Sequence, residues 1–552
     1  MPHQSFPQFR PQGDQGLLVY LGQGIDPALN ARVRRLALAL SAEPLPGVLE
    51  VLAAYCCLMV HLDPLLTDHG QVEAWAREVL AALPPGQETG GRLVEVPVVY
   101  GGEHGPDLEE VARRAGFSPQ EVIRRHAGRD YLCYLVGFTP GFPFLGGLEP
   151  ALATPRLDSP RLDLPAGAVG IGGDQTGLYP LGGPGGWRIL GRTALMIYDP
   201  RREPPTLISA GDRVRFLPAP ALDFPAPPPA RQLWQDHGLP VFKVLSPGGF
   251  STVQDQGRRG CLERGVPVSG ALDQYALAAA NALVGNPHGA AALEITLLGP
   301  KLQVLTPTLV AVAGADLGPR LDGRPAPAWT PLSLAPGQVL SFHGPKNGAR
   351  AMLAISGGLA ALPLLGSRST YPLGRLGAPL QAGDILKALP APLPPAGPAL
   401  APELRPRTSR SITLRVLAGP NQEFFTTTGQ ETFYAAEYQV SSRADRRGVR
   451  LEGPAVQMEP GGPSSIVSEP NLPGIVQVTP DGQPMVLLNE QTVGGYAKIA
   501  TIISPDLDLL ARALPGDRVR FARLDLDQAL AAARQRAGGL RGLREMLAAS
   551  NP

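Results

Sequence analysis

Glycine and proline recur every few residues from position 137 to position 193, and this spacing constrains the fold more than any other feature. The stretch opens with Gly-Phe-Thr-Pro-Gly-Phe-Pro-Phe-Leu-Gly-Gly at 137–147, and few of its segments are long enough for a helix. Short apolar runs, such as residues 168–171 and 195–198, lie between the turns. The pattern predicts short strands joined by ordered turns, in a barrel or a compact sheet with elaborated loops.

Polar side chains are unusually dense on these turns. Rigid glycine and proline turns would hold them in place for a polar or anionic ligand. The alternative is that the arginines pair with aspartates and pin the loops, and for any single residue this structural role is favoured. The polar residues of the stretch are Arg156, Arg161, Gln175, Thr176, Tyr179, Trp187, Arg188 and Arg192.

The composition excludes several classes of protein. The 552 residues carry a formal net charge of +1, which gives no indication of a protein that binds nucleic acid or a membrane surface. No apolar run approaches the ~20 residues of a membrane span, and the N-terminus lacks the pattern of a signal peptide. The four cysteines have no metal-ligand spacing, and adjacent Cys56 and Cys57 are typical of small core residues. We therefore expect a cytoplasmic protein without a metal site of its own.

Two proline-rich segments, 218–229 and 388–406, have the composition of linkers and divide the chain into three blocks. The fold class predicted is mainly β with an α+β N-terminal domain. The expected organisation is the N-terminal domain at 1–88, a barrel at 89–217, a linker at 218–240, a barrel-like domain at 241–387, a linker at 388–410, a further barrel at 411–525 and a helical tail at 526–552.

Few helices are indicated. Asp26 followed by Pro27 predicts a helix that runs to about residue 42, and another is expected at 71–83. In the second block, the apolar face of residues 274–284 predicts one helix after Asp273.

Two further short helices are expected between strands at 93–100 and 131–136. Their capping boxes are Asp107 with Glu110 and Ser118 with Glu121. His126 and Arg129 follow at the helix-to-strand junction, where a side chain could point into the mouth of a barrel. A solvated helix end with favourable charge placement is an equal alternative.

The sequence also contains an internal echo. Gly-Asp-Arg-Val-Arg-Phe at 211–216 recurs word for word at 516–521, and Gly-Gly-Trp at 185–187 parallels Gly-Gly-Tyr at 494–496. Gln175-Thr176 and Gln491-Thr492 are related dipeptides in the same order. This order suggests a duplicated barrel, and Gly-Asp-Ile-Leu at 383–386 is a weaker third copy of the terminal strand.

The second and third blocks carry their own polar clusters on turns. Arginine binds carboxylate or phosphate, so the three clusters together favour a shared anion-binding cleft between barrels, for ATP or a carboxylate substrate. No phosphate loop, zinc motif or nucleophile elbow is present, and no Ser/His/Asp set can be identified. The polar residues are Gln254, Asp255, Arg258, Ser269 and Asp273, followed by Arg443, Asp445, Arg446, Arg450, Gln477, Gln491, Thr492, Tyr496 and Lys498.

Several long motifs resemble a known family. Residues 137–147, with Thr-Pro-Arg at 154–156 and Gln-Thr-Gly-Leu-Tyr-Pro at 175–180, are similar to the KipI-type domain, also known as allophanate hydrolase subunit 1. Val-Gln-Asp-x-Gly-Arg at 253–258, Gly-Val-Pro-x-Ser-Gly-Ala-x-Asp at 265–273 and Gln-Thr-x-Gly-Gly-Tyr at 491–496 are similar to the KipA-type, subunit 2 domain. The chain therefore resembles a KipI–KipA fusion over roughly residues 10 to 525.

The resemblance implies tandem cyclophilin-like β-barrels and the activity of the B and C components of a bacterial 5-oxoprolinase. It implies ATP-dependent opening of 5-oxoproline to glutamate, with a separate LamB/YcsF-type protein, the A component, as partner and Mg²⁺ accompanying ATP. No covalently attached cofactor is expected, since no Ala-Met-Lys-Met biotin site is present. Glu469 and Asn471 depart from the glycine that the family commonly has after Ser-Glu. Whether the chain forms a homo-oligomer stays open.

The polar residues inside these motifs are the candidate site residues. For catalysis they are Arg156, Gln175, Asp255, Arg258 and Lys498. For binding of substrate or nucleotide they are His126, Thr139, Arg161, Thr176, Tyr179, Trp187, Gln254, Ser269, Asp273, Arg443, Arg446, Gln477, Gln491, Thr492 and Tyr496.

Two alternative functions remain. The same modules occur in biotin-dependent carboxyltransferases related to urea amidolyase, although any biotin carrier would have to come from another polypeptide. KipI-like proteins also act as binding proteins that inhibit a kinase. A pure binding protein would not need three polar clusters.

Overall fold

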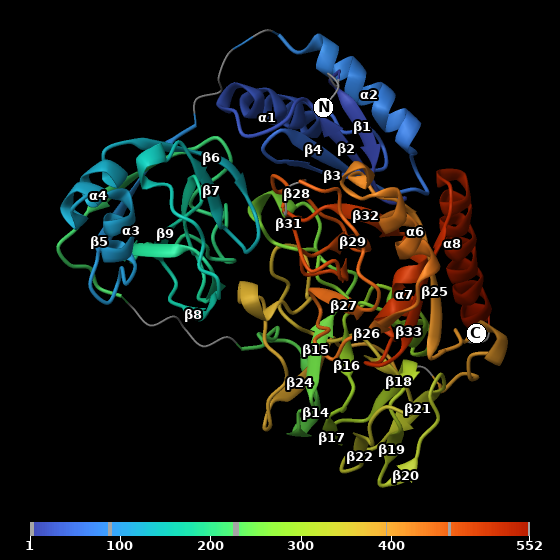
Figure 1. Ribbon diagram of the computed structural model, residues 1–552. Coiled ribbons are helices and arrows are strands. Elements are labelled where there is room, and N and C mark those ends of the chain that lie inside the picture. The colour runs from blue at the N-terminus through green and yellow to red at the C-terminus, as the bar shows by residue number, and fades with distance from the viewer. Residues whose placement is uncertain are drawn as a thin grey trace.

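The computed structural model describes residues 5–84, 86, 91–224, 231–393, 395–461 and 465–549. The first unit is a four-stranded antiparallel sheet covered by two helices (Figure 1). Its core joins apolar residues of both helices to the sheet, including Val33, Leu36 and Val60. The strand order is β1 (Gln8–Pro11), β2 (Gly16–Tyr20), β4 (Cys57–Leu62) and β3 (Val48–Ala53), with helices α1 (Pro27–Ala42) and α2 (His69–Ala82). Asp26 caps α1 as predicted, by accepting a hydrogen bond from the Leu29 amide at 2.7 Å.

A closed seven-stranded barrel follows, and it confirms the prediction of short strands joined by glycine turns. Its order is β10 (Gln175–Leu178), β7 (Pro143–Gly146), β6 (Asp130–Val136), β13 (Arg213–Pro218), β5 (Leu93–Tyr100), β12 (Arg188–Arg192) and β9 (Ala168–Gly172). The flanking elements are α3 (Leu108–Ala115), α4 (Pro119–Ala127), the short helix at Pro150–Leu152 and the hairpin of β8 (Arg161–Leu164) with β11 (Gly183–Gly185).

The two predicted capping boxes have different outcomes. Ser118 caps α4 by accepting from the Glu121 amide at 3.2 Å, which is half of the predicted box; in the described helix the Glu121 carboxylate pairs with Arg124 and Arg125 and does not return a hydrogen bond to the cap. The Asp107 side chain makes no cap hydrogen bond to α3, so this prediction was wrong. Its carboxylate instead accepts from the Ile189 amide and from Arg161, because a charged partner on a neighbouring hairpin competes for it.

The middle block contains two open sheets and the predicted helix α5 (Gln274–Leu283), which Asp273 caps. The six-stranded sheet has the order β20 (Arg324–Pro325), β19 (Pro319–Leu321), β22 (Val339–Phe342), β17 (Lys301–Val304), β14 (Leu239–Ser246) and β24 (Ile385–Ala388). The five-stranded sheet has the order β15 (Phe250–Gln254), β16 (Ala292–Thr296), β23 (Asn347–Ile355), β18 (Thr308–Asp316) and β21 (Pro331–Leu334).

The last block is a further closed barrel of seven strands. Its order is β25 (Ser411–Ala418), β32 (Lys498–Ile502), β29 (Ile475–Val478), β30 (Pro484–Leu487), β27 (Gly448–Glu452), β26 (Tyr438–Val440) and β33 (Arg518–Arg523). A small hairpin joins β28 (Glu469–Pro470) to β31 (Val493–Gly494), and the helices are α6 (Thr427–Ala435), α7 (Leu507–Ala511) and α8 (Leu526–Ala549).

The internal echo reflects a structural duplication of the barrel. In both barrels the repeated segment forms a strand that pairs in parallel with the first strand, β13 with β5 and β33 with β25. The aspartates before these strands, Asp212 and Asp517, each accept a hydrogen bond from the amide three residues earlier. The same turn recurs at Asp384, but β24 then pairs antiparallel with β14 in an open sheet.

The Gln-Thr dipeptides are not equivalent positions of the two barrels. Gln175-Thr176 begins β10, and the strand in the corresponding place of the last barrel is β30. Gln491-Thr492 lies after β30 and before β31. The Gly-Gly-Trp and Gly-Gly-Tyr segments do correspond, since each follows or overlaps the small hairpin beside its barrel.

The first two units pack against the rest of the chain along a continuous surface, which we call the seam (Figure 1). One apolar core crosses it, with Leu135 and Phe142 on one side and Leu262, Leu472 and Val493 on the other. Polar side chains cross it as well, as described below. Within the described residues, none of the helices has the length and apolar character that a bilayer crossing requires.

Candidate functional site

The predicted site residues of the first barrel separate into a core pair and a surface set. His126 and Thr176 form the core pair: His126 Nε2 lies 2.8 Å from Thr176 Oγ1, and its Nδ1 lies 2.8 Å from the Tyr100 hydroxyl. The imidazole is fully buried and stacks on Phe216. Burial lowers the pKa of His126 to about 3, so the ring is neutral. His126 is therefore a hydrogen-bonded core residue and does not point into a mouth.

The surface set carries less free charge than its composition suggests. Arg161 donates two hydrogen bonds of 2.8 Å to the Asp107 carboxylate, so it pins the β8 hairpin to the start of α3. Tyr179 and Trp187 are buried, and glycines 172 and 177 leave room for the Trp187 ring. Arg156 is exposed, with its guanidinium carbon 5.9 Å from the centre of that ring. Gln175 is half-buried at the start of β10.

Lys498 lies in a second place, on the seam. Its side chain is fully buried, and Nζ lies 2.5 Å from Glu469 Oε2. The Tyr20 hydroxyl, from the N-terminal sheet, donates to the other oxygen of Glu469 at 2.9 Å. Gln477 is buried nearby, close to Gly494. Lysine, glutamate and tyrosine thus form a compact hydrogen-bonded group that joins the two sides of the seam.

The third place brings the KipA-type motifs together. The Arg258 amide donates to the Val268 carbonyl at 2.8 Å, and the Ala271 amide donates to the Asp255 carbonyl at 2.9 Å. The residues 253–258 and 265–273 therefore lie side by side. We call this region, with the segments 367–371 and 489–492, the junction.

Asp255 organises one side of the junction. Its carboxylate accepts hydrogen bonds from the Gly257 and Arg368 amides, at 2.8 and 2.7 Å. It also accepts from the hydroxyls of Ser367 and Ser369, at 2.6 and 2.5 Å. Three of these donors meet Oδ1 and one meets Oδ2, so the carboxylate shapes the loop around Ser369.

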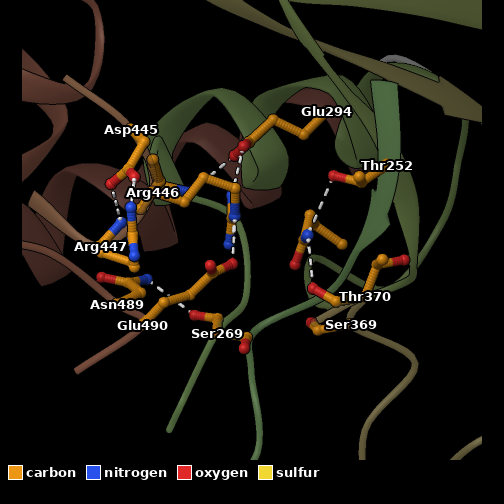
Figure 2. A network of polar contacts seen from close by, with 12 residues as sticks. Thr252, Ser269, Glu294, Ser369, Thr370, Asp445, Arg446, Arg447, Asn489 and Glu490 are labelled. Carbon is orange, nitrogen blue, oxygen red and sulfur yellow. Dashed lines mark hydrogen bonds and ion pairs between the residues drawn. The ribbon is translucent and has the colours of Figure 1, made fainter. Parts of the chain in front are cut away.

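Arg446 organises the other side (Figure 2). Its guanidinium forms ion pairs with Glu490, at 2.6 Å, and with Glu294, and it donates to the Gly270 carbonyl at 2.7 Å. All three charged side chains are buried. Burial raises the pKa of Glu490, and the Arg446 charge opposes that shift. This triad fixes the last barrel against β16 and the segment 269–272.

Arg258 and its neighbours differ from these satisfied groups. The Arg258 side chain is 1 % exposed and donates from Nη2 to the Ser369 carbonyl at 2.5 Å. Its Nε and Nη1 have no hydrogen-bond partner among the described residues. The same holds, across the described chain, for Gln254 Oε1, Ser269 Oγ and the Tyr198 hydroxyl, all of them buried. The junction therefore contains unsatisfied donors and one acceptor around a buried cation.

The loop at 137–142 closes the junction from the first barrel. The Phe138 amide donates to Thr492 Oγ1 at 3.2 Å, and the Gly141 amide donates to the Arg264 carbonyl at 2.9 Å. Gly265 lies directly against Thr139, so a side chain there would collide with the Thr139 carbonyl. Thr139, Thr492, Ser269 and Arg258, predicted from separate motifs, thus belong to one region.

The remaining predicted residues have other roles or places: Asp273 and Gln491 stand in the junction segments, and Arg443 and Tyr496 lie outside them. Asp273 pairs with Arg512 at 2.5 Å and caps α5, which is a structural role. Arg443 is exposed, while Gln491 and Tyr496 are half-buried. Among the described residues, no group of three or more His, Cys, Asp or Glu side chains could hold a metal ion.

A surface pocket of about 730 Å³ on the seam is lined by none of the predicted site residues. It lies between Arg10 on β1 and residues 417–423 and 523–526 of the last block. Arg10 is already paired with Glu423 at 2.5 Å. The pocket is large enough for a small ligand; the charge of Arg10 is neutralised, and Arg523, which also lines the pocket, has its guanidinium carbon 5.9 Å from the centre of the Tyr434 ring.

Sequence reasoning missed several residues that shape these sites. Tyr198, Glu294, Ser369 and Glu490 are examples, and Tyr20 is another on the seam. Glu294 carried a usable signal, because a single carboxylate inside the apolar strand Ala-Leu-Glu-Ile-Thr must be paired if it is buried. Tyr198 ends a short apolar run and Ser369 stands in an ordinary turn sequence, and neither gave such a signal.

Two carboxyltransferase-domain family models match the chain. The model for subdomains C and D matches residues 7–208, and the model for subdomains A and B matches residues 264–523.

Named relatives match the same two parts. The chain is 41% identical to the B subunit of the Bacillus subtilis 5-oxoprolinase over 220 residues, which are 38% of this chain and 92% of that protein. It is 36% identical to the C subunit of the Escherichia coli 5-oxoprolinase over 301 residues, which are 53% of this chain and 94% of that protein. The urea amidolyase of Lachancea kluyveri is 33% identical over 308 residues, 51% of this chain but 17% of that protein.

Solved structures extend the likeness to nearly the whole chain. The crystal structure of TTHA0988 superposes with a TM-score of 0.83 at 40% identity and covers 92% of this chain and 100% of that one. The Kluyveromyces lactis urea amidolyase gives a TM-score of 0.52 at 31% identity, covering 56% of this chain and 20% of that one.

Proposed function

Since the chain belongs to the carboxyltransferase-domain family, we propose that it supplies the fused B and C components of an ATP-dependent 5-oxoprolinase. These two components occur as separate proteins among its relatives. The observation that carries the proposal is that the chain covers 92% of one relative's B component and 94% of another's C component. The reaction opens 5-oxo-L-proline to L-glutamate, in the cytoplasm, together with a separate LamB/YcsF-type protein as the A component.

The chemistry explains why ATP is required. A lactam carbonyl is a poor electrophile, and transfer of a phosphoryl group to its oxygen makes that oxygen a leaving group. Water can then add to the ring carbon, and the carbon–nitrogen bond breaks as the ring nitrogen takes a proton, which leaves an acyl phosphate. A second water then cleaves the acyl phosphate to the carboxylate of glutamate and inorganic phosphate. Fixed cationic groups stabilise the charge that develops on the oxygens during such steps.

The residues of the chain fit part of this scheme. The junction holds a buried guanidinium and hydroxyl donors, which suit a carboxylate or phosphate oxygen. Mg²⁺ is usually held by one or two carboxylates together with the phosphates of its nucleotide, so we expect it to arrive bound to ATP. The LamB/YcsF-type protein would complete the phosphoryl-transfer site.

The test is a reconstitution. The purified chain is combined with the LamB/YcsF-type protein, 5-oxoproline, ATP and Mg²⁺, and glutamate and ADP are measured. We expect both products to form in parallel, and only when both proteins are present. Absence of glutamate with a folded partner would reject the proposal.

A second candidate function rests on the urea amidolyase relatives, whose matching parts are also carboxyltransferase domains. In this case the chain would transfer a carboxyl group from biotin on a separate carrier. The same preparation, supplied with a carboxylated biotin carrier and urea, would then transfer the carboxyl group from the carrier to urea. The 5-oxoprolinase proposal predicts no such transfer.

A further inference from the structure

Arg258 is a buried charge that the protein leaves without an ion pair. Two other buried arginines of the region are neutralised, Arg446 by Glu294 and Glu490 and Arg512 by Asp273, whereas buried Arg350 resembles Arg258 in donating to one backbone carbonyl. Arg258 donates only to a backbone carbonyl, and in the described part of the chain Nε and Nη1 have no partner. A buried charge without an ion pair is costly, so Arg258 would gain from an anionic partner that is not part of this chain.

The groups around Arg258 have a definite chemical character. Gln254 is fixed beside it, because Arg258 and Gln254 donate to the consecutive carbonyls of Ser369 and Thr370. Tyr198 reaches the region from the first barrel: burial raises the pKa of its hydroxyl and the nearby Arg258 charge lowers it. The set offers one cation, two hydroxyls and the Gln254 carbonyl oxygen, which can accept an N–H.

Ser269 is held in a strained conformation that sets the position of its hydroxyl. Its φ is 52°, in the left-handed region that a serine rarely adopts. Its backbone is clamped from both sides by Asn489, whose carbonyl accepts from Ser269 at 2.9 Å and whose Nδ2 donates to it at 2.8 Å (Figure 2). Strain of this kind persists only where the surroundings enforce it, and it is concentrated at functional sites.

The loops that carry these residues have little freedom to shift. Gly257 and Gly270 have φ values of 92° and 77°, and a side chain on Gly270 would meet the Gly257 amide nitrogen at 2.7 Å. The unsatisfied groups are therefore held in fixed positions before any ligand arrives, which reduces the cost of binding.

We propose that Arg258, Gln254, Ser269 and Tyr198 form a binding site for a small molecule with an anionic group, either a carboxylate or a phosphate. The identity of the molecule rests on the proposed function: it is 5-oxoproline. Arg258 binds its carboxylate, Gln254 Oε1 accepts a hydrogen bond from its lactam N–H, and the two hydroxyls donate to its oxygens. Because Arg258 is buried, entry requires the 137–142 loop to move. Two hydrogen bonds, to Thr492 and Arg264, hold that loop in place.

The test measures binding directly, so that it does not depend on turnover. Isothermal titration of the full chain uses 5-oxoproline, inorganic phosphate and 2-pyrrolidinone, which is the same lactam without the carboxylate. The variants are Arg258→Met and Arg258→Lys. Arg350→Met is the matched control, since Arg350 is also buried, donates to one backbone carbonyl and has an unsatisfied Nε, but lies outside the proposed site.

We expect 5-oxoproline to bind and 2-pyrrolidinone to bind roughly tenfold to hundredfold more weakly, which is the loss of one charged hydrogen-bonded contact. Arg258→Met should lose 5-oxoproline binding by a similar factor, Arg258→Lys should keep part of it, and Arg350→Met should keep all of it. Since the methionine removes an unpaired buried charge, the midpoint of unfolding of Arg258→Met without ligand should be equal to or higher than that of the wild type.

The other outcomes separate the two proposals. Arg258-dependent binding of phosphate, but not of 5-oxoproline, would support the anion site and assign it to a nucleotide. Arg258-dependent binding without glutamate release would support the site and reject the 5-oxoprolinase function. Glutamate release with unchanged binding in Arg258→Met would overturn the site and leave the function standing. Failure of all three probes to bind the wild type, or a large loss of stability in Arg258→Met with binding retained, would also overturn it.

Discussion

At the scale of single residues, the seam depends on a buried ion pair. Lys498 and Glu469 are both shielded from water, and Tyr20 donates the remaining hydrogen bond to the carboxylate. Lys498 was predicted to be catalytic from its motif. In the structure it pairs with Glu469, 29 residues away in the same block, and the hydrogen bond from Tyr20 to Glu469 connects this pair across the seam. Both facts are compatible with a catalytic lysine. They also lead us to expect that Lys498 contributes measurably to the stability of the folded chain.

We expect Lys498→Met to lower the free energy of unfolding by about 3–5 kcal/mol, because it leaves the Glu469 carboxylate buried without its cation. Urea denaturation measures the change. The double variant Lys498→Met/Glu469→Gln should recover a large part of the loss, since neither charge then remains. Equal losses in the single and double variants would contradict the importance of the ion pair.

Glu50 makes the stability of the seam depend on pH. Its carboxylate accepts from the Leu262 amide at 2.6 Å and from the Gly260 amide at 3.2 Å, across the seam. Burial raises its pKa from 4.5 to about 7; the Leu262 hydrogen bond opposes this, and the Glu263 charge adds to it. The folded chain thus holds this proton more tightly than the unfolded chain, so the contribution of Glu50 to stability falls between pH 4.5 and pH 7.

Glu50→Gln cannot ionise and should lack this dependence. We expect the free energy of unfolding of Glu50→Gln, minus that of the wild type, to increase from pH 5 to pH 8. Denaturation at several pH values measures it. The exposed Glu43→Gln, in the same N-terminal unit, is the matched control. A constant difference for Glu50→Gln would contradict the raised pKa.

At the scale of secondary-structure elements, Asp107 connects three parts of the first barrel. It stands at the start of α3, accepts from the β12 amide of Ile189 at 2.7 Å, and binds Arg161 of β8. This one carboxylate therefore links a helix, a barrel strand and a hairpin.

Asp107→Ala should therefore destabilise the barrel by about 1–3 kcal/mol, since the buried Ile189 amide loses its acceptor. Arg161→Met should cost less, because that side chain is partly exposed. Thermal unfolding compares the two variants, and ligand titration should show unchanged affinity for Arg161→Met. Loss of ligand affinity without loss of stability would restore Arg161 to the binding role that its sequence position suggested.

The sequence predicted elements better than sites, for physical reasons. Caps such as Asp26 and Ser118 act within three residues, and the barrel strands are bounded by local glycine turns. The predicted cap at Asp107 was wrong because the partner of its carboxylate, Arg161, lies 54 residues away in the sequence. Site geometry is likewise non-local: the motifs placed Arg258 and Ser269 near one another, but nothing local to Tyr198 indicated that the first barrel contributes to the junction.

At the scale of the whole molecule, the seam joins into one folded body the parts that are two separate chains in relatives. Apolar residues and buried polar pairs both cross it: Asp14, for example, accepts from the Ser504 amide and hydroxyl at 2.9 and 2.6 Å. The covalent connection between the blocks is therefore only one of the features that hold them together.

We expect the chain to stay assembled when it is divided. Residues 1–224 and 231–552, co-expressed as separate polypeptides with a tag on one of them, should purify together in equal amounts. Asp14→Ala should weaken this association in the divided protein, as measured by size exclusion at decreasing concentration. An exposed substitution such as Glu103→Gln serves as the control. Separation of the unmodified pieces at micromolar concentration would contradict a stable seam.

The seam also has a consequence for gene dosage. A cell that makes the two parts from separate genes must match their rates of synthesis. Any surplus half would expose apolar seam residues such as Leu135 and Leu472 to water, and proteases and chaperones recognise such surfaces. A single reading frame delivers one copy of each half by construction. Selection against unmatched halves is thus a sufficient reason for the fusion to persist, independent of any gain in catalytic rate.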